Sequence, residues 1–329
     1  MKKNILSILL MSSLLITAVT GLTGCGGSGK ADKGTEVHIG YFNNITHAQA
    51  LLMKAEGTLE QSFGDEVNVK WTAFNAGPAE VEALFSGDID IGYIGPVPAV
   101  SANVKSKGDV QILSSATQNG AVLVKRAGAD IESVDDLAGK TVAIPQLGNT
   151  QHLSLLNLLA ENNLSPVTSG GDVNVTAVEN ADVANTMERG DIDAALVPEP
   201  WGATLLSQGA ELVLDADEVN PSGDYDVAVV VVRKEFMENN PELVEKFLEA
   251  HEDATVAIND HQESSLETIN KEIDTATGKN LSSEIINEAF TRIGVSTEIN
   301  KDAIIDFANI SQEQEFISEL PEEDSLFVE

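Results

Sequence analysis

The chain has 329 residues, of which 42% are hydrophobic, and it carries a formal net charge of −34. This length and composition allow two domains with sizeable cores. The acidity argues strongly against nucleic acid as a partner, because neutralising phosphates requires a basic surface. We expect the charge to keep the protein soluble, for example in a salty or alkaline medium.

The N-terminal segment has the pattern of an export signal. Two lysines and an apolar run precede Leu22-Thr23-Gly24-Cys25, whose small residues mark a cleavage site. These four residues resemble the lipobox of bacterial lipoproteins, in which the cysteine is acylated, and Cys25 is the only cysteine of the chain. We therefore predict a lipoprotein signal peptide over 1–24, a flexible tether over 25–35 and a lipid anchor on Cys25. The alternative is an ordinary secretory peptide with an incidental cysteine.

Strand and helix patterns alternate along the rest of the chain, which is typical of an α/β protein. Thr46-His47-Ala48-Gln49 predicts a capping box at the start of the first helix. Asn119-Gly120 before the apolar run 121–126 indicates a hairpin. The unbroken apolar run 226–233 suits a strand buried on both faces, and we place it in the same lobe as 121–126. In chain order, the main predicted strands are 36–41, 67–74, 89–93, 110–117, 121–126, 141–145, 173–178, 194–197, 211–215 and 226–233, and the main helices are 46–57, 78–85, 99–105, 153–162, 182–189, 241–261, 283–293 and 301–310.

One sequence plan occurs twice. Gly87-Asp88-Ile89-Asp90 is repeated by Gly190-Asp191-Ile192-Asp193, and each copy lies between a helix pattern and an apolar strand that ends at a proline. A second pair of strand, polar loop and helix patterns, around Thr46 and Thr150, has nearly the same offset. Matching offsets favour two α/β lobes of similar plan. The alternative is chance, because this tetrapeptide is a common way to leave a helix.

The repeat sets the predicted domain boundaries. The first part of lobe 1 covers 36–126 and lobe 2 covers 127–224. The last part, 225–329, returns to lobe 1 and adds C-terminal helices. Two passages between the lobes, near 126–130 and 219–225, imply a hinge.

The loops that follow the predicted strands have an unusual composition. In α/β sheets, ligands bind beyond the carboxyl ends of the strands. The loops there contain Asn, Gln, Thr, Gly, two His and one Glu, but no Arg or Lys. Such loops can bind an oxyanion through the N–H groups of helix N-termini and through neutral side-chain donors. The six loops are 43–47, 75–77, 94–98, 118–120, 146–152 and 198–201.

Each candidate residue also has a simpler structural interpretation. Thr46 caps a helix, the loop glycines form turns, and Trp201 packs in a core. Glu199 either grips an amino group or caps a helix. His47 and His152 are expected to donate hydrogen bonds rather than to bind a metal. The sequence has no HExxH, Cys/His pair or G-x-S-x-G motif, so we predict no metal, no cofactor and no catalytic residue.

Several stretches together identify a family resemblance that covers most of 36–260. The chain resembles the solute-binding proteins of ABC importers in the nitrate, sulfonate and taurine group, and most of all the aliphatic-sulfonate branch. Pro96 replaces a polar position of that branch. The resemblance implies an α/β, two-lobed type II periplasmic-binding-protein fold, with mixed sheets flanked by helices and a hinge of two crossovers. The stretches are Lys54-Ala55-Glu56-Gly57-Thr58-Leu59-Glu60, Trp71-Thr72-Ala73-Phe74-Asn75-Ala76-Gly77-Pro78, Leu84-Phe85-Ser86-Gly87-Asp88-Ile89-Asp90-Ile91-Gly92 and Pro198-Glu199-Pro200-Trp201.

The function expected from these observations is capture of a small sulfonate, such as an alkanesulfonate or taurine, for delivery to an ABC permease. The protein is expected to be a non-enzymatic monomer, exported and lipid-anchored at the outer face of the cytoplasmic membrane or in the periplasm. The alternatives are a binder of nitrate, bicarbonate or a neutral pyrimidine-type metabolite, and a pyrimidine-synthesis enzyme on the same scaffold. The predicted ligand-binding residues are Asn44, Thr46, His47, Gly77, Gly95, Pro96, Gln118, Asn119, Gly148, Asn149, Thr150, Gln151, Glu199 and Trp201.

Overall fold

The computed structural model describes residues 35–220, 224–260 and 262–328. The predicted signal peptide, the tether up to residue 34 and the lipid anchor on Cys25 lie outside the described residues. None of the helices in the described ranges is long and apolar enough to cross a membrane.

Six strands of the described ranges form the first sheet, in the order β11-β4-β10-β3-β1-β2. β1 is parallel to β2 and β3, whereas β10 is antiparallel to both β3 and β4. The sheet is therefore mixed, as predicted. Its strands are Thr35–Phe42 (β1), Val67–Phe74 (β2), Ile91–Ile94 (β3), Val110–Asn119 (β4), Asp226–Arg233 (β10) and Ile293–Val295 (β11).

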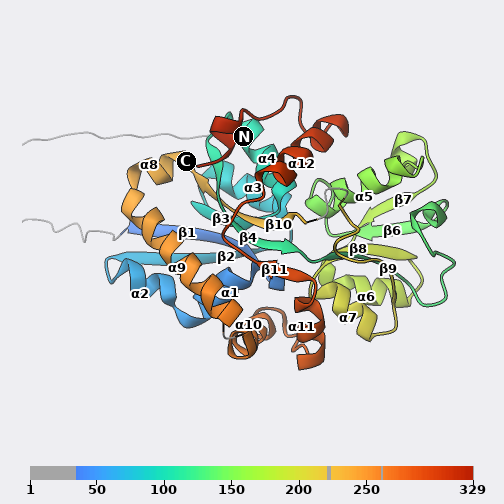
Figure 1. The fold of residues 1–329 in the computed structure, drawn as a ribbon, viewed down its shortest axis with the longest axis horizontal. Coiled ribbons are helices and arrows are strands. Elements are labelled where there is room, and N and C mark those ends of the chain that lie inside the picture. Colours follow the sequence, from blue (N-terminus) through green and yellow to red (C-terminus); the bar gives the residue numbers. More distant parts are fainter. Residues whose placement is uncertain (1–34, 221–223, 261, 329) are drawn as a thin grey trace, which may run out of the picture. The chain divides into compact units, whose positions relative to one another are not determined.

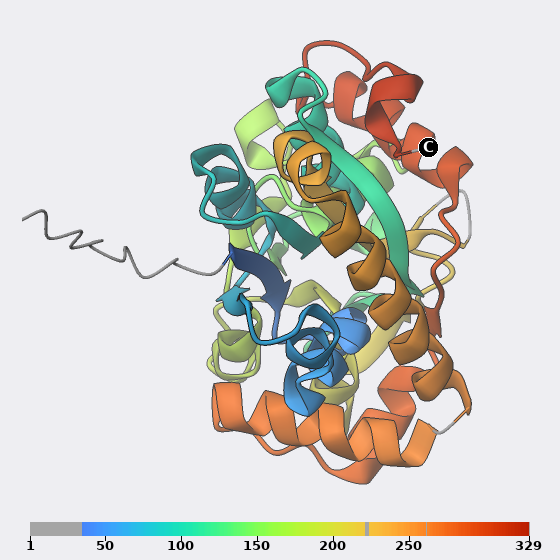
Figure 2. The same cartoon turned by 90° about the vertical axis from the view of Figure 1, so that its left-hand side faces the viewer.

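Helices cover both faces of this sheet, and we call the sheet and these helices lobe 1. The valines of β10 are buried because both of its faces pack against helices, as the unbroken apolar run predicts. Figures 1 and 2 show α1, α2, α9 and α10 on one face and α3, α4 and α12 on the other. The bounds are Ile45–His47 (η1), Ala48–Glu56 (α1), Thr58–Phe63 (α2), Gly77–Ser86 (α3), Pro96–Ser106 (α4), Lys234–Asn239 (α8), Pro241–Asp260 (α9), Gln262–Thr277 (α10), Lys301–Glu313 (α12) and Glu323–Leu326 (α13).

A second mixed sheet, with five strands in the described ranges and the order β7-β6-β8-β5-β9, forms lobe 2 with its helices. α5 packs on one face, and α6 and α7 pack on the other. β3 and β8, which follow the two copies of the repeated tetrapeptide, lie in different sheets. The bounds are Ala121–Lys125 (β5), Val134–Leu137 (η2), Thr141–Ile144 (β6), Thr150–Glu161 (α5), Val167–Ser169 (η3), Asn174–Ala177 (β7), Asn180–Glu188 (α6), Ala194–Pro198 (β8), Trp201–Ser207 (α7) and Glu211–Leu214 (β9).

The predicted hairpin at Asn119-Gly120 is wrong. β4 pairs with β10 and β11, whereas β5 pairs with β8 and β9 of the other sheet. The chain therefore passes into lobe 2 at Gly120, not near 126–130. Asn119 and Gly120 have φ angles of 57° and 85°. This left-handed pair reverses the chain into the neighbouring sheet rather than back along the same one. The second passage lies between β9 and β10.

The predicted capping box is also wrong. The N-cap of α1 is His47, and no side chain caps that helix. Instead, Gln49 Nε2 donates to Ala116 O at 2.7 Å and to Thr255 Oγ1 at 3.2 Å. Gln49 thus joins α1 to β4 and α9, because a buried amide must find partners wherever the surrounding elements offer them.

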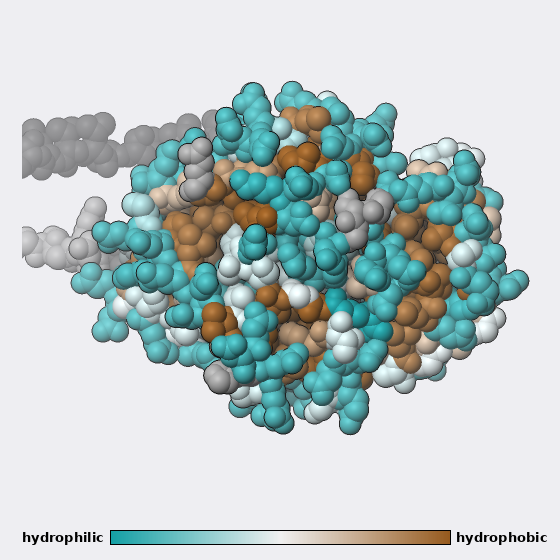
Figure 3. Space-filling model, viewed as in Figure 1, coloured by the Kyte–Doolittle hydropathy of each residue, from teal (hydrophilic) through white to brown (hydrophobic). Residues whose placement is uncertain are grey.

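The C-terminal segment contacts both lobes. α11 (Ser283–Phe290) packs against α7 of lobe 2, and β11 then joins the sheet of lobe 1. Figure 3 shows hydrophilic side chains over much of one face of the molecule, interrupted by separate hydrophobic patches, which agrees with the acidic composition.

Candidate functional site

A small cavity lies where the two lobes face each other, at the carboxyl ends of β1, β3, β6 and β8. Its volume is about 30 Å³, which is enough for one or two ordered waters. None of the described residues that line it carries a formal charge at neutral pH, as the loop composition predicts. They are Phe42, Asn44, Thr46, His47, Asn75, Ala76, Gly77, Gly95, Pro98, Pro145, Asn149, Thr150, Gln151, Asn180, Pro198 and Val227.

Several helices begin at this cavity. Ala76 and Gly95 are the N-caps of α3 and α4 in lobe 1, and Asn149 is the N-cap of α5 in lobe 2. α6 begins at Asn180, which also lines the cavity. The first N–H groups of a helix lack intrahelical acceptors and carry the positive end of the helix dipole. Helix starts from both lobes therefore create a positive potential without a cationic side chain.

Asn44 presents a donor to the cavity because its acceptor is occupied. Trp201 Nε1 donates to Asn44 Oδ1 at 2.7 Å. An indole N–H can only donate, so the amide orientation of Asn44 is fixed by its partner. The Nδ2 group has no partner among the described residues and remains available to a ligand. This bond also joins lobe 1 to α7 of lobe 2.

His47 is held in the same way. Its Nδ1 accepts from Phe42 N at 3.2 Å, and the ring is 2% exposed. Burial lowers the pKa of His47 to about 3, so the imidazole is neutral. Since a backbone N–H can only donate, the proton of the neutral ring lies on Nε2. His47 therefore offers an N–H donor and no positive charge.

The start of α5 supplies the donors of lobe 2. Asn149 Oδ1 accepts from His152 N at 2.8 Å, and Asn149 Nδ2 donates to Gln151 Oε1 at 3.0 Å. These two bonds occupy both carbonyl oxygens, which leaves Gln151 Nε2 as a free donor. Thr150 Oγ1 is buried and has no hydrogen-bond partner in the described structure. A buried hydroxyl without a partner is costly, which points to a ligand that accepts from it.

Two lining asparagines differ from this pattern. Asn75 Nδ2 donates to Glu179 Oε1 at 3.1 Å, which leaves its acceptor oxygen at the exposed edge. Asn180 Oδ1 is buried without a partner, and no bond fixes its orientation, so the amide can turn its donor inward. The interior of the site is thus rich in donors. This arrangement suits an oxyanion, whose oxygens only accept.

The structure brings eight of the fourteen predicted residues to the cavity lining. These are Asn44, Thr46, His47, Gly77, Gly95, Asn149, Thr150 and Gln151. The Thr46 and Asn149 loops therefore meet at one site. Gly95 is required there, because a Cβ on it would lie 2.3 Å from Thr150 Oγ1 of the other lobe.

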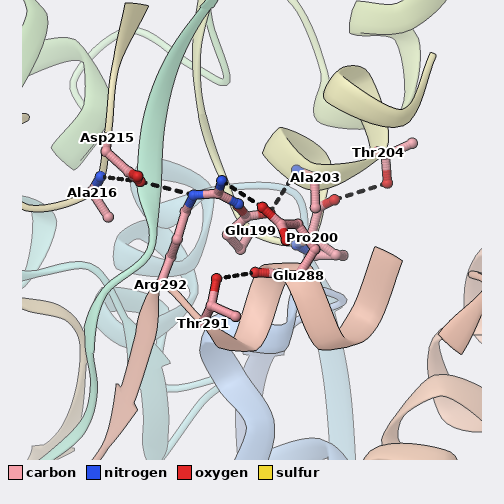
Figure 4. Close-up of polar contacts among 9 residues, drawn as sticks. All are labelled: Glu199, Pro200, Ala203, Thr204, Asp215, Ala216, Glu288, Thr291 and Arg292. Carbon is pink, nitrogen blue, oxygen red and sulfur yellow. Dashed lines mark hydrogen bonds and ion pairs between the residues drawn. The ribbon is translucent and has the colours of Figure 1, made fainter. Parts of the chain in front are cut away.

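Six predicted residues lie outside the lining. Gln118 and Asn119 fall in β4 at the crossover, where Asn119 Nδ2 donates to Asp224. Pro96 begins α4, and Gly148 donates its N–H to His152 Nδ1. Glu199 turns away to pair with Arg292 (Figure 4), and Trp201 donates to Asn44.

The lining also contains residues outside the fourteen predicted ones. Four of them lie in the predicted loops 75–77, 94–98 and 198–201, namely Asn75, Ala76, Pro98 and Pro198. Sequence reasoning missed the strand ends Phe42 and Pro145, and Asn180 at the start of a polar helix. No sequence pattern indicated that Val227 lines the cavity, because its position there depends on the placement of β10 between β4 and β3. No group of three or more His, Cys, Asp or Glu side chains in the described ranges is placed to hold a metal.

Comparison with known proteins identifies the family. The profile of the NMT1-like family matches residues 30–270. The chain belongs to the NMT1-like family. The taurine-binding periplasmic protein of Escherichia coli is 33% identical to this NMT1-like protein over 206 residues, which are 62% of the chain and 61% of the relative. The chain thus matches less than two thirds of that relative's length.

Solved structures confirm the two-lobed fold of this NMT1-like protein. The alkanesulfonate-binding protein SsuA from Xanthomonas axonopodis pv. citri, bound to MOPS, superposes with a TM-score of 0.75 at 20% identity, over 90% of this chain and 99% of that one. The periplasmic nitrate-binding protein NrtA from Synechocystis PCC 6803 superposes with a TM-score of 0.65 at 16% identity, over 86% and 82%. The predicted α/β architecture and the resemblance to the nitrate, sulfonate and taurine group are confirmed.

Proposed function

We propose that this protein is the extracytoplasmic solute-binding component of an ABC importer and that it captures a small sulfonate between its lobes. The observation that carries the proposal is the donor-rich cavity, in which internal hydrogen bonds occupy the acceptors of Asn44, His47 and Gln151. A hydrogen bond to a charged acceptor contributes roughly 1.5–3 kcal/mol, about twice a neutral one. Several such donors bind an anion without a cationic side chain.

A sulfonate fits this site in charge. Its three oxygens share one negative charge at every physiological pH, and each accepts hydrogen bonds. The cavity is too small for a bulky aromatic ligand in this arrangement, since its volume is about 30 Å³. The compact head group is therefore the part of the ligand that we place here.

A neighbouring groove offers room for the rest of the ligand. It has a volume of about 430 Å³ and shares Asn75, Ala76 and Pro145 with the cavity. Alanine, proline and Phe74 side chains line it, which suits a short alkyl chain. The Glu179 carboxylate lies in the same groove and suits an ammonium group, as in taurine.

Binding by both lobes explains how the ligand-bound protein can differ in shape from the free protein. Donors from lobe 1 and lobe 2 contact the same anion, so the ligand favours the closed arrangement. We place the hinge at the two passages between the sheets. The closed form is what a membrane permease would recognise. The periplasmic relatives support an extracytoplasmic location, and we retain the lipid anchor on Cys25 and a monomeric state as parts of the proposal.

A ligand panel tests the proposal. Thermal unfolding of the purified protein is measured with methanesulfonate, ethanesulfonate, taurine, nitrate, bicarbonate and a neutral pyrimidine, and each hit is quantified by isothermal titration calorimetry. We expect the sulfonates to raise the melting temperature by several degrees. If none does, the sulfonate assignment is wrong. Turnover of any of these compounds would favour an enzyme instead.

Nitrate or bicarbonate is the second candidate. The small cavity favours it, because either ion fills little more than the space of a few waters. The similarity in fold to a nitrate-binding protein is compatible with this alternative. In the panel, stabilisation by nitrate or bicarbonate without any response to sulfonates would select it.

A further inference from the structure

A charged cluster lies outside the cavity; its arginine and one of its carboxylates are buried, and its other two carboxylates are partly exposed. Its centre is Arg292, which precedes β11. Arg292 Nη1 lies 3.2 Å from Glu199 Oε1, Nε lies 2.8 Å from Asp215 Oδ1, and Nη2 lies 2.8 Å from Glu288 Oε1. Figure 4 shows the guanidinium between these carboxylates, which come from lobe 2 and from α11. We call these four residues the Arg292 cluster.

Glu199 is the member that touches the binding machinery. Its side chain is fully buried, and its second oxygen, Oε2, accepts from Ala203 N at 2.8 Å in the first turn of α7. The carboxylate therefore fixes the start of α7. A Cβ on Gly202 would lie 2.3 Å from Val122 Cγ2 and 3.1 Å from Glu199 Oε1, so this turn is packed without spare room.

Trp201 is the first residue of α7, and its indole reaches the site. The side chain is 7% exposed and makes the hydrogen bond that orients Asn44. Lys279 Nζ lies 5.5 Å from the centre of the ring and donates to Ala181 O, so the C-terminal segment also contacts the indole. The position of α7 thus determines where the Asn44 amide points.

We propose that Arg292 is a positioning residue that sets the ligand-binding orientation of Asn44 through Glu199, α7 and Trp201. The inference rests on the proposed function in so far as Asn44 contacts the ligand. Arg292 lies where the chain passes from α11, which packs on lobe 2, to β11 in the sheet of lobe 1. It therefore couples the C-terminal segment to the wall of the binding site.

The chemistry of the cluster explains why an arginine is needed. A fully buried carboxylate is stable only when it is paired. The planar guanidinium offers several N–H donors in a fixed geometry and can serve three carboxylates at once. A lysine ammonium has a compact charge on a flexible stem and cannot reproduce this geometry. Without Arg292, Glu199 must either move toward water or take up a proton, and either change weakens its hold on the first turn of α7.

The test uses Trp201 as the reporter. Trp71→Phe removes the other tryptophan, so that fluorescence of the full-length protein reports on Trp201 alone. Acrylamide quenching without ligand measures how well the indole is shielded, and calorimetry with ethanesulfonate measures the dissociation constant. Arg292→Lys is compared with the control Arg189→Lys, because Arg189 is exposed and pairs with Asp191 on its own loop. Circular dichroism confirms that each variant is folded.

We expect Arg292→Lys to raise the quenching constant at least twofold and the ethanesulfonate dissociation constant at least tenfold, and Arg189→Lys to change neither. Arg292→Met should expose Trp201 further, and adding Glu199→Gln should restore most of the shielding, because a neutral amide needs no cation and its oxygen still accepts from Ala203. If Arg292 acted only by packing, Glu199→Gln would not restore the shielding of Trp201 in Arg292→Met.

The inference is overturned if Arg292→Lys shields Trp201 as well as the parent does, or if Glu199→Gln fails to rescue Arg292→Met. Quenching is measured without ligand, so it remains informative if the ligand is not a sulfonate. A protein that binds nitrate instead would fail the calorimetry with ethanesulfonate in the parent and would leave the quenching result unchanged.

Discussion

Replacing Asn44 by aspartate tests the donor-rich site with little change in shape. The aspartate keeps an oxygen that accepts from Trp201 Nε1, so the contact between the lobes is preserved. The other atom changes from an N–H donor to a carboxylate oxygen that faces the ligand. Asn44→Asp thus replaces attraction for an anion by repulsion, in a side chain of the same size.

The expected effect is large. Losing a hydrogen bond to a charged acceptor costs roughly 1.5–3 kcal/mol. Two like charges about 4 Å apart repel by about 4 kcal/mol at an effective dielectric constant near 20. Together these give roughly 5.5–7 kcal/mol, which corresponds to a loss of affinity of about 10⁴- to 10⁵-fold.

Isothermal titration calorimetry with ethanesulfonate, or with the oxyanion that stabilises the parent best, measures this loss. The control is Asn239→Asp, which adds the same charge at an exposed position of α8. We expect the control to bind within twofold of the parent. Binding by Asn44→Asp within tenfold of the parent would show that the Asn44 amide does not face the anion.

Three further predictions concern Thr150, Glu199 and His47. Thr150→Val should weaken oxyanion binding about tenfold, by roughly 1.5 kcal/mol. It should leave the melting temperature of the free protein unchanged or raise it, because Oγ1 has no partner to lose and a buried hydroxyl without a partner is costly; calorimetry and thermal unfolding check this. Burial raises the pKa of Glu199 from 4.5 to about 7. Between pH 4.5 and 7 the folded state therefore binds more protons than the unfolded state, and the free energy of unfolding falls as the pH rises. Glu199→Gln should remove up to about 3 kcal/mol of this pH dependence, as measured by urea unfolding. Burial lowers the pKa of His47 to about 3, so in the Glu199→Gln variant, which removes the buried carboxyl that titrates near pH 7, the ethanesulfonate dissociation constant should stay within twofold between pH 5.5 and 8.5.

Each of these predictions has a clear contradiction. An unchanged affinity in Thr150→Val would place the ligand away from α5. A parent and a Glu199→Gln variant with parallel stability curves between pH 4.5 and 7 would mean that Glu199 is ionised at its ordinary pKa. Binding that tightens on acidification with a midpoint near 6.5 would mean that His47 binds the ligand as a cation.

The sequence predicted the two lobes because their signals are local. The tetrapeptides at 87–90 and 190–193 mark equivalent strand starts, β3 and β8, in separate sheets. The polar loops at Thr46 and Asn149 follow β1 and β6, and in each sheet the ligand-binding loops lie at the carboxyl ends of the strands. Eight of the predicted site residues line the cavity for this reason.

The failures concern long-range partners. The strands at 121–125 and 226–233 are both apolar, and their composition does not say which sheet each one joins. Glu199 and Trp201, which were predicted to bind the ligand, lie outside the cavity lining. Their orientation depends on Arg292 and on Asn44, which lie 93 and 157 positions away in the chain. The donor-rich character of the site has the same origin, because internal bonds that no local pattern reveals occupy the acceptors.

A comparison of ethanesulfonate with ethanesulfonamide by isothermal titration calorimetry tests the central claim most directly. The two compounds have nearly the same shape, but the sulfonamide is neutral at pH 7 and has an N–H₂ group in place of one oxygen. Weakening three charge-assisted hydrogen bonds by about 1 kcal/mol each predicts at least about 100-fold weaker binding of the sulfonamide. Equal affinities would contradict a site built to recognise negative charge.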